Sequence, residues 1–261
     1  MSAFRPDVLA GRVALVTGGG TGICKGIARA FVDHGARVCI TSRRQEVLDQ
    51  AAADIGGDVL PMAADVRDPD QLARVVAAAV DRFGKLNTLV NGAAGNFLAP
   101  TAALSAKGFR TVIEIDLLGT FHATKAAFDP LRDSGDGCII NISATLHYHG
   151  TPLQSHAAAA KAGVDALTRN LAVEWGPFGI RANAIAPGPI GDTEGMRRLA
   201  PGDIGAKVER RVPLRRLGRI DDVANAAVFL ASPAAAYING AVLVVDGGDS
   251  VAPGLADLLS P

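Results

Sequence analysis

The sequence predicts an α/β fold, a doubly wound parallel sheet in a single domain that spans residues 1–261. Three observations support this prediction. Short apolar segments rich in β-branched residues alternate with longer helical patterns along the whole chain, which is typical of a parallel sheet with helices on both faces. A glycine-rich turn follows the first apolar segment. Hydrophobic residues make up 49% of the chain, which is enough to bury one large core.

The charge balance and the cysteines argue against several classes of function. Lys+Arg and Asp+Glu number 26 each, so no basic surface indicates nucleic acid or an anionic membrane as a partner. No apolar segment approaches the roughly 20 residues that span a bilayer. Cys24, Cys39 and Cys138 lack metal-ligand spacing, so we expect no metal. The chain starts without a signal peptide and ends without a peroxisomal address, so we expect a cytoplasmic protein.

The first apolar segment, residues 12–17 (RVALVT), suits a buried parallel strand. A glycine turn follows it, and a helical pattern then runs through Ile27, Ala30 and Phe31. At such a strand–turn–helix junction, backbone N–H groups and the helix N-terminus face the pyrophosphate of a dinucleotide. We expect cofactor contacts from Gly18, Gly20, Thr21, Gly22 and Ile23.

The second apolar segment, residues 37–41, ends in Ser42, Arg43 and Arg44. In dinucleotide-binding folds a carboxylate near this point accepts hydrogen bonds from the ribose of NAD. No carboxylate is present here, and the planar guanidinium group of arginine suits phosphate. We therefore expect NADPH as cofactor, with Ser42 and Arg43 at its 2′-phosphate. The alternative is that these arginines are surface residues at the start of a helix.

The rest of the chain continues the alternation. We expect strands at residues 58–63, 86–91, 137–143, 180–186 and 241–246, and helices at residues 69–83, 105–130, 153–175 and 221–231. The proline at position 130 should end the second of these helices. Residues 191–219 are rich in Gly, Pro and Arg, which indicates a mobile lid over a substrate.

The chain resembles the short-chain dehydrogenase/reductase family over nearly its whole length. The resemblance is carried by the glycine turn, by residues 91–97 (NGAAGNF), by Lys161 and by residues 187–190 (PGPI). It implies a Rossmann-type nucleotide site with further cofactor contacts. These contacts are expected from Asp65, Val66, Asn91, Ala93, Gly95, Lys161, Pro187, Gly188 and Ile190.

One residue of the glycine turn departs from the family pattern. Cys24 stands where the family has its last glycine, the one that allows the helix to pack closely on the sheet. Cysteine is small enough to be accommodated there. Whether cofactor affinity suffers is a question for the structure.

Two catalytic hydroxyl groups of that family are absent. Its members carry a Tyr four residues before the lysine and a Ser about thirteen residues before the Tyr, where this chain has Ala157 and Ala144. Residues four apart lie on one helix face, so Ala157 and Lys161 should face the same cleft. Reduction of a ketone needs an acid at the developing alkoxide. Tyr148, in the loop before the helix, is the candidate replacement, although a pocket wall or surface position is the alternative.

Conjugate reduction makes a different demand on the site. When hydride attacks the far end of a diene conjugated to a thioester, negative charge spreads to the thioester oxygen. That oxygen needs hydrogen-bond donors, as in an oxyanion hole. The proton finally goes to carbon, and a held water can deliver it. The residues that remain in this site fit conjugate reduction better than carbonyl reduction.

A closer resemblance is to the 2,4-dienoyl-CoA reductases, of which the peroxisomal type fits best. It rests on residues 91–97, 141–146 (NISATL), 172–177 (AVEWGP) and 187–195, and on the His-Ala pair that precedes Lys161. The resemblance implies reduction of 2,4-dienoyl-CoA to 3-enoyl-CoA with NADPH, a step of β-oxidation of unsaturated fatty acids. The substrate would be an acyl-CoA thioester, and the family implies a homotetramer.

The same resemblance implies roles for five residues. Lys161 would bind the nicotinamide ribose and place a positive charge near the dienolate. Asp116 would hold or protonate a water, and a plain ion pair with the lysine is the alternative. Phe97 would pack on the acyl chain. Arg67 and Arg198 are candidates for the CoA phosphates, with solvated surface arginines as the alternative.

Two other functions stay open at this point. The first is an NADPH-dependent carbonyl or 3-ketoacyl reductase whose acid has moved. The second is a catalytically silent dinucleotide-binding scaffold, which Ala144, Ala157 and Cys24 together suggest. Retention of Lys161 beside a complete nucleotide site argues against silence. His156 is expected at the edge of the pocket, and a proton-transfer role is its less favoured interpretation.

Overall fold

A seven-stranded parallel sheet forms the centre of the computed structural model, which describes residues 3–199 and 203–251. Its strand order is β3-β2-β1-β4-β5-β6-β7. The strands are β1 (Val13–Thr17), β2 (Arg37–Ser42), β3 (Val59–Ala63), β4 (Thr88–Asn91), β5 (Cys138–Ile142), β6 (Arg181–Pro187) and β7 (Val242–Val245). The order reverses between β1 and β4, the type of position where doubly wound sheets bind ligands. The predicted fold class is confirmed.

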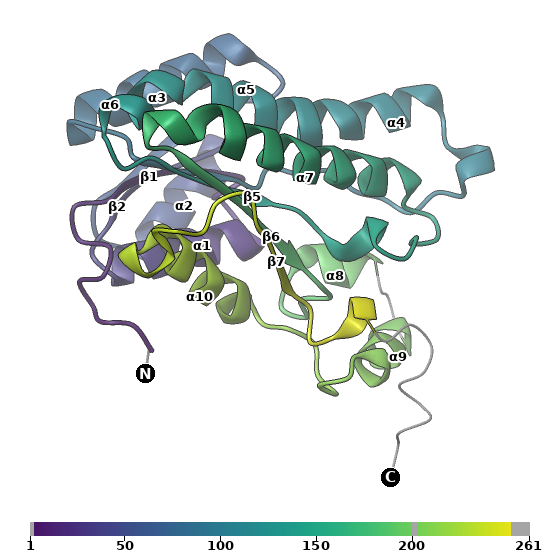
Figure 1. Cartoon of the computed structure of the whole chain (residues 1–261). Helices are drawn as coiled ribbons and strands as arrows, with labels where there is room; N and C mark the ends of the chain where they lie inside the picture. The colour runs from purple at the N-terminus through teal and green to yellow at the C-terminus, as the bar shows by residue number, and fades with distance from the viewer. Residues whose placement is uncertain (1–2, 200–202, 252–261) are drawn as a thin grey trace.

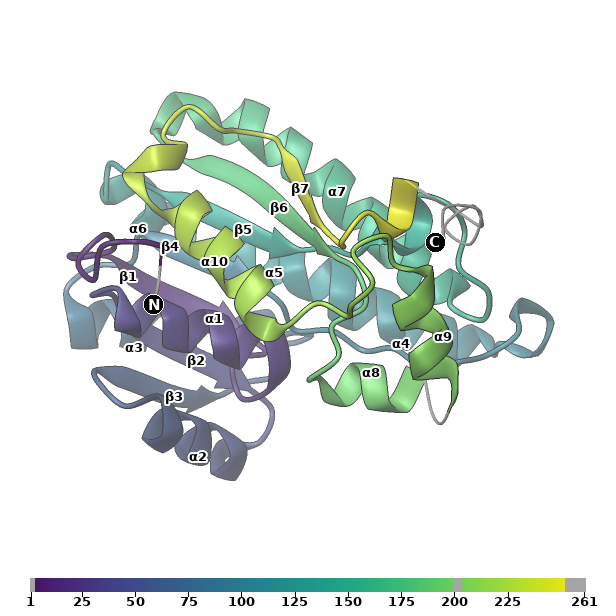
Figure 2. The ribbon, with the colours of Figure 1, turned by 90° about the horizontal axis from the view of Figure 1, so that it is seen from below.

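Helices cover both faces of this sheet (Figures 1 and 2). One layer contains α3 (Pro69–Phe83), α4 (Ala106–Ile113), α5 (Gly119–Ala126), α6 (Phe128–Asp133) and α7 (Ser155–Trp175). The opposite layer contains α1 (Gly22–Asp33), α2 (Gln45–Ile55) and α10 (Ile220–Ala231). Two further helices, α8 (Glu194–Leu199) and α9 (Asp203–Arg211), lie beyond the carboxyl ends of the strands.

The strands are apolar throughout because both of their faces are buried. Alternate residues of β1 enter different cores: Ala14 and Val16 pack with α1 and α10, whereas Val13 and Leu15 pack with α3 and the helices beside it. Successive side chains of a strand point to opposite faces, so an all-apolar segment fills two cores at once. This packing fixes the carboxyl ends of the strands in one row.

The predicted helix over residues 105–130 is wrong in its continuity. The chain forms α4, then a π-helical turn, η2 (Glu114–Leu118), then α5, and α6 follows with Pro130 inside it. Pro130 does not end a helix because it sits in the first turn of α6, where backbone N–H groups have no intrahelical acceptor. A π-helical turn inside an α-helix often marks a functional site.

Two other segments differ from the sequence-based prediction. The helix α2 follows the second strand, where a helix start was only the alternative interpretation of the two arginines. Residues 191–219, predicted as a lid, contain α8 and α9 within the described part of the chain. The expected strand and helix boundaries elsewhere hold to within one or two residues.

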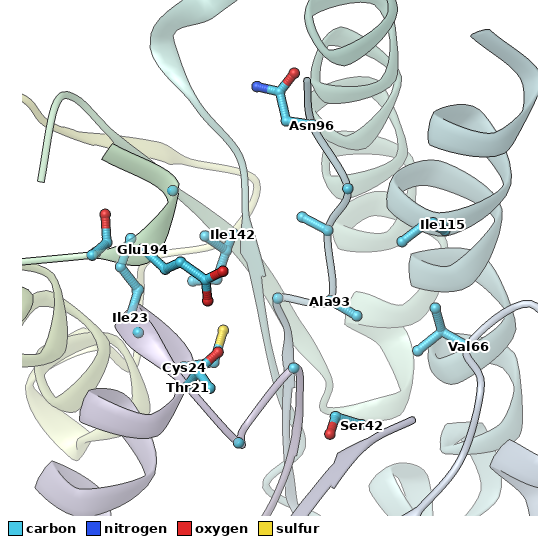
Figure 3. A pocket seen from close by; sticks show the side chains of 18 of the residues that line it. Thr21, Ile23, Cys24, Ser42, Val66, Ala93, Asn96, Ile115, Ile142 and Glu194 are labelled. Atoms are coloured by element: carbon cyan, nitrogen blue, oxygen red, sulfur yellow. The ribbon is translucent and has the colours of Figure 1, made fainter. Parts of the chain in front are cut away.

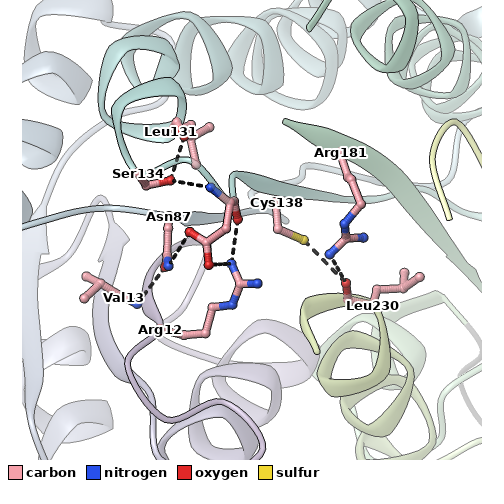
Figure 4. A network of polar contacts seen from close by, with 9 residues as sticks. Arg12, Val13, Asn87, Leu131, Ser134, Cys138, Arg181 and Leu230 are labelled. Atoms are coloured by element: carbon pink, nitrogen blue, oxygen red, sulfur yellow. Dashed lines mark hydrogen bonds and ion pairs between the residues drawn. The ribbon is translucent and has the colours of Figure 1, made fainter. Parts of the chain in front are cut away.

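A polar network fastens the amino ends of the strands (Figure 4). The buried Asn87 accepts a hydrogen bond from the backbone N–H of Val13 at 2.9 Å and donates one to Asp136 at 3.0 Å. Arg12 donates to the backbone carbonyl of Asp136 at 2.7 Å, and Arg181 donates to that of Leu230 at 2.9 Å. These bonds tie loops to strands at the amino ends of the strands. Glycine turns lie at the carboxyl ends of the strands, and the candidate site is located there.

Across the described ranges, no helix is both long enough and apolar enough to cross a membrane.

Candidate active site

A cavity of about 530 Å³ opens at the carboxyl ends of the strands, where the strand order reverses. The turn after β1 and the ends of β2, β4, β5 and β6 line it. In Figure 3, Ile23 and Glu194 stand on one side and Val66 and Ile115 on the other. Ser42 lies toward one end of the view and Asn96 toward the other. The lining therefore extends from the end of β2 to the segment after β4.

The glycine turn after β1 presents backbone to this cavity. Gly18 has a positive φ of 73°, and an added Cβ would lie 2.9 Å from the backbone oxygen of Gly92, so only glycine fits. Helix α1 begins just beyond the turn and has no acidic residue in its first turn. Free N–H groups and the helix dipole at this end favour an anion. The residues present therefore fit the pyrophosphate of a dinucleotide.

Cys24 fills the space beside the turn after β4. Its thiol lies so close to Gly92 that an added Cβ there would be 2.1 Å from Sγ. Burial raises the pKa of Cys24 to about 12, so the thiol stays protonated and acts as a small apolar group. The cysteine is accommodated because residue 92 has no side chain. The two positions therefore form a complementary pair.

Basic residues gather at the end of the cavity near β2. Ser42, Arg43 and Arg44 all line it, together with Asp65 after β3. Arg67 donates to Asp65 from Nε at 3.0 Å, and this bond is the main reason why the pKa of Asp65 lies below its usual value. Arg67 is thus held by a neighbouring carboxylate and does not line the cavity.

Lys161 and Asp116 form a buried ion pair at the other end. The Lys161 ammonium donates to the backbone carbonyl of Ile142 at 2.9 Å and lies 3.4 Å from Oδ2 of Asp116. Asp116 accepts a 2.7 Å hydrogen bond from the backbone N–H of Gly95 on its other oxygen. An ammonium has three donors, so one N–H of Lys161 stays available for a ligand in the cavity that it lines.

The buried position of Asp116 shifts its acid–base equilibrium toward the neutral form, although the carboxyl is still paired with Lys161. Burial raises the pKa of this carboxyl, and the nearby Lys161 charge offsets only part of the effect. The π-helical turn η2 places Asp116 here, because it widens the helix between α4 and α5. A carboxyl with a raised pKa carries a proton near neutral pH more often than an ordinary aspartate does, so it can hold a water and supply a proton to it.

Tyr148 is directed elsewhere. Its hydroxyl donates to Oδ2 of the buried Asp165 at 3.4 Å, and His147 Nε2 lies 2.9 Å from the same oxygen. Partial burial, followed by the Asp165 charge, raises the pKa of Tyr148 to about 12. Tyr148 does not line the cavity. It is therefore poorly placed to replace the missing tyrosine.

The structure brings together most of the residues predicted to bind cofactor. Those that line the cavity are Gly18, Gly20, Thr21, Gly22, Ile23, Ser42, Arg43, Asp65, Val66, Ala93, Gly95, Lys161, Pro187 and Gly188. Asn91 instead donates to Thr124 and Asn141 inside the buried layer, and Ile190 packs against Gly218 in the core. Phe97 lies on the ring of His156 rather than in the cavity. The side chain of Arg198 falls outside the described residues.

Several lining residues were not predicted. They are Cys24, Arg44, Asn96, Ile115, Ser143, Ala144, Thr193, Glu194 and Gly195, among others. Most adjoin predicted ones in the sequence, so adjacency was the available signal. Ser143 is informative because its hydroxyl is buried and has no hydrogen-bond partner. A bound ligand would satisfy it. No cluster of three or more metal-ligating side chains occurs among the described residues.

Comparisons with known proteins show which proteins this chain resembles in sequence and in structure. A family profile described as enoyl-(acyl carrier protein) reductase matches residues 18–250. A peroxisomal 2,4-dienoyl-CoA reductase of Arabidopsis thaliana, named as (3E)-enoyl-CoA-producing, is 49% identical over 259 residues, covering 95% of this chain and 87% of that protein. A probable 2,4-dienoyl-CoA reductase of Bacillus subtilis, named as (2E)-enoyl-CoA-producing, is 41% identical over 248 residues and covers 93% and 98%. The crystal structure of a short chain dehydrogenase from Bacillus anthracis is 42% identical, with a TM-score of 0.83 over 91% of this chain and 96% of that one.

The contact between Cys24 and Gly92 predicts a double-mutant result. Gly92→Ala should lower the free energy of unfolding by about 1–3 kcal/mol, the usual cost of overpacking, and should weaken NADPH binding. Cys24→Gly combined with Gly92→Ala should recover both, because it removes the thiol that collides. Urea denaturation and NADPH titration measure the two effects. Gly176→Ala is the matched control, since its added Cβ meets nothing closer than 3.5 Å and the residue does not line the cavity. Equal losses in the single and double variants would contradict the pairing.

Proposed function

The chain is an oxidoreductase of the short-chain dehydrogenase/reductase family, and from this premise we propose that it reduces 2,4-dienoyl-CoA to 3-enoyl-CoA with NADPH. One observation supports the proposal above the others. The cleft keeps the Lys161–Asp116 ion pair but has Ala144 and Ala157 in place of hydroxyl groups. Neither alanine offers an acid for an alkoxide, whereas the ion pair offers a cation and a carboxyl for a dienolate. The role in β-oxidation of unsaturated fatty acids belongs to the same proposal.

In this proposal a bound nicotinamide cofactor would supply a hydride to C5 of the dienoyl chain. The residues of the chain then manage the charge and the proton. The Lys161 ammonium places a positive charge near the dienolate, and its available N–H binds the nicotinamide ribose. Asp116 holds a water and passes a proton through it to the substrate carbon.

The cofactor preference for NADPH rests on the end of β2. Arg43 and Arg44 line the cavity beside Ser42, and no carboxylate stands at the end of that strand. Guanidinium groups bind phosphate through charge-assisted hydrogen bonds, and they gain little from a bare ribose hydroxyl. The 2′-phosphate is therefore the group that this end of the cavity suits.

The position of the product double bond follows the nearer of the two relatives compared. The Arabidopsis thaliana protein is named as producing the (3E)-enoyl thioester, and the less similar Bacillus subtilis protein as producing the (2E) form. Protonation at C2 of the dienolate gives the 3-enoyl product, whereas protonation at C4 gives the 2-enoyl product. We propose protonation at C2.

Two alternatives from the sequence receive less support. A carbonyl reductase needs an acid at the carbonyl oxygen, and Tyr148 instead donates to Asp165 outside the cavity. A silent scaffold does not account for burying an ion pair, which costs desolvation energy without a matching gain in stability.

Assembly and location remain proposals as well. A homotetramer is supported by the exposed apolar residues Phe109, Leu118 and Phe121 along α4, η2 and α5. The small residues of α7 support it less than expected, because Ala157, Ala160 and Ala172 pack inside the chain. Light scattering at micromolar concentration should give the mass of four chains, and a monomer mass would contradict this. The cytoplasmic location stays a prediction, since the named eukaryotic relative is peroxisomal.

The proposed reaction is tested with two substrates in parallel. NADPH oxidation, followed by absorbance, should be fast with 2,4-hexadienoyl-CoA and negligible with acetoacetyl-CoA. Turnover of the ketone alone would favour the carbonyl reductase. Turnover of neither substrate would favour the scaffold.

The first variant concerns the cofactor. Arg43→Ala should raise the dissociation constant of NADPH about tenfold or more, because one charge-assisted hydrogen bond contributes roughly 1.5–3 kcal/mol. NADH binding should change little. Arg74→Ala is the control, since Arg74 is exposed on α3 and does not line the cavity. Equal weakening of NADH and NADPH would show that Arg43 does not bind the phosphate.

The second set of variants concerns proton delivery. Asp116→Asn keeps the acceptor for Gly95 but removes the acidic proton, so turnover should fall about 10²–10⁴-fold while NADPH binding stays nearly intact. Lys161→Ala should damage turnover and NADPH binding together. Ala157→Tyr should not improve dienoyl-CoA turnover. Steady-state kinetics and NADPH titration measure both effects, and an Asp116→Asn enzyme with unchanged turnover would remove the aspartate from the mechanism.

A further inference from the structure

Ser143 lines the cavity, and its hydroxyl has no hydrogen-bond partner within the described part of the chain. The residue is buried, with 3% of its surface exposed. A buried polar group without a partner costs free energy, and native structures contain few of them. The buried hydroxyls of Thr41 and Thr88 also lack partners, but neither residue lines the cavity. At Ser143, a ligand in the cavity can supply the missing partner.

The backbone holds Ser143 in place from both sides. Its N–H donates to the carbonyl of Ile185 in β6 at 2.7 Å. The carbonyl of the preceding residue, Ile142, accepts a hydrogen bond of 2.9 Å from the Lys161 ammonium. The side chain breaks no hydrogen bond when it turns between staggered rotamers, because the hydroxyl has no partner. The hydroxyl can therefore turn to meet a ligand while the backbone stays fixed.

Ser143 and Lys161 serve the same part of the cavity. The hydroxyl belongs to the residue directly after the carbonyl that holds the ammonium, and both side chains are part of the lining. Figure 3 shows Ile142, the residue between them in this chain of contacts, near the middle of the view. A neutral donor and a positive charge are thus available side by side. An oxygen that acquires negative charge is the acceptor that such a combination suits.

In the proposed reaction this acceptor is the thioester oxygen. Alanines stand at positions 144 and 157, where the family has hydroxyl groups. Ala144 has an extended backbone, with φ −163° and ψ 161°, and successive side chains of an extended segment point in different directions. Ser143 therefore does not occupy the position of the absent serine. It reaches a ligand from a neighbouring part of the lining, close to the ammonium.

We propose that the Ser143 hydroxyl donates a hydrogen bond to the thioester carbonyl oxygen of the acyl-CoA substrate and stabilises the negative charge that reaches this oxygen on hydride transfer. The inference rests on the proposed function, and it names a side chain that recognises the thioester. No covalent bond forms at Oγ, and its proton stays on the serine. The hydrogen bond strengthens as charge gathers on the oxygen, so its main effect falls on kcat.

The first test is kinetic. Ser143→Ala should lower kcat for 2,4-hexadienoyl-CoA about 10²–10³-fold, the usual loss when one oxyanion donor is removed, and should leave the NADPH dissociation constant unchanged. Ser143→Cys offers a weaker donor of similar shape, so its kcat should lie between those of the wild type and the alanine variant. Thr88→Val is the matched control, because it also removes a buried hydroxyl without a partner but lies outside the cavity lining. Its kcat should equal that of the wild type.

Stability separates a role in recognition from a structural role. Removal of a hydroxyl without a partner should leave the urea midpoint of Ser143→Ala unchanged or higher. Ser232 provides the comparison, since it is buried and its hydroxyl donates to the carbonyl of Phe229 at 2.8 Å. Ser232→Ala should lower the urea midpoint and leave kcat unchanged.

An infrared measurement identifies the acceptor directly. NADP⁺ has no hydride to transfer, so 2,4-hexadienoyl-CoA labelled with ¹³C at the thioester carbonyl stays intact in a complex with the enzyme and NADP⁺. A hydrogen bond to a carbonyl oxygen lowers its stretching frequency. The labelled carbonyl should therefore absorb at a lower frequency in the wild type and in Thr88→Val than in Ser143→Ala.

The outcomes separate this inference from the proposed function. A lower kcat and a higher carbonyl frequency in Ser143→Ala, with an unchanged or raised urea midpoint, support it. Wild-type kcat in Ser143→Ala overturns the role of the serine and leaves the proposed function intact. Weaker NADPH binding with an unchanged carbonyl frequency also overturns it, since the hydroxyl then binds the cofactor. A lower urea midpoint with an unchanged carbonyl frequency overturns it in favour of a structural role. Absence of dienoyl-CoA turnover in the wild type overturns the proposed function and this inference with it.

Discussion

The ion pair between Lys161 and Asp116 is the interaction on which the rest of the site depends. Removing two charges from water costs several kcal/mol per ion, and a buried pair seldom repays this in stability. Two backbone groups compensate the pair, the carbonyl of Ile142 at the end of β5 and the N–H of Gly95 after β4, and a π-helical turn carries Asp116. This desolvation cost arises at one place in the sheet, at the end of the cavity where the nicotinamide end of a cofactor would lie.

The missing hydroxyls change what that pair is able to do. With Tyr and Ser, the lysine of this family serves an acid that protonates oxygen. With Ala144 and Ala157 in their positions, the same lysine faces a carboxyl whose pKa is raised by burial. Charge on a delocalised oxygen needs a donor rather than a full proton transfer, and the proton is required at carbon. The site has lost the groups for the first task and keeps groups for the second.

The sequence predicts the fold well because the apolar segments with their glycine turns and the family pattern are both local features of the sequence. Apolar segments and glycine turns locate the strands, and the family pattern locates the nucleotide residues along one edge. Other features depend on contacts across space. The π-helical turn at Asp116 and the helix that includes Pro130 both read as one continuous helical pattern. The fit of Cys24 against Gly92 joins two segments that lie far apart in the chain, and no local pattern predicts it. Likewise, Phe97 was predicted to contact the acyl chain, whereas the structure places it on His156.

Isotope placement in the product tests the central claim most directly. The reaction is run in D₂O with 2,4-hexadienoyl-CoA and with NADPH that carries protium at the transferred position. NMR of the product should show the cofactor hydrogen at C5 and one solvent deuterium at C2, with the double bond at C3. Solvent deuterium at C4 would show that the enzyme forms the 2-enoyl product instead. A product reduced at the thioester carbonyl, with no new hydrogen at C5, would contradict conjugate reduction itself.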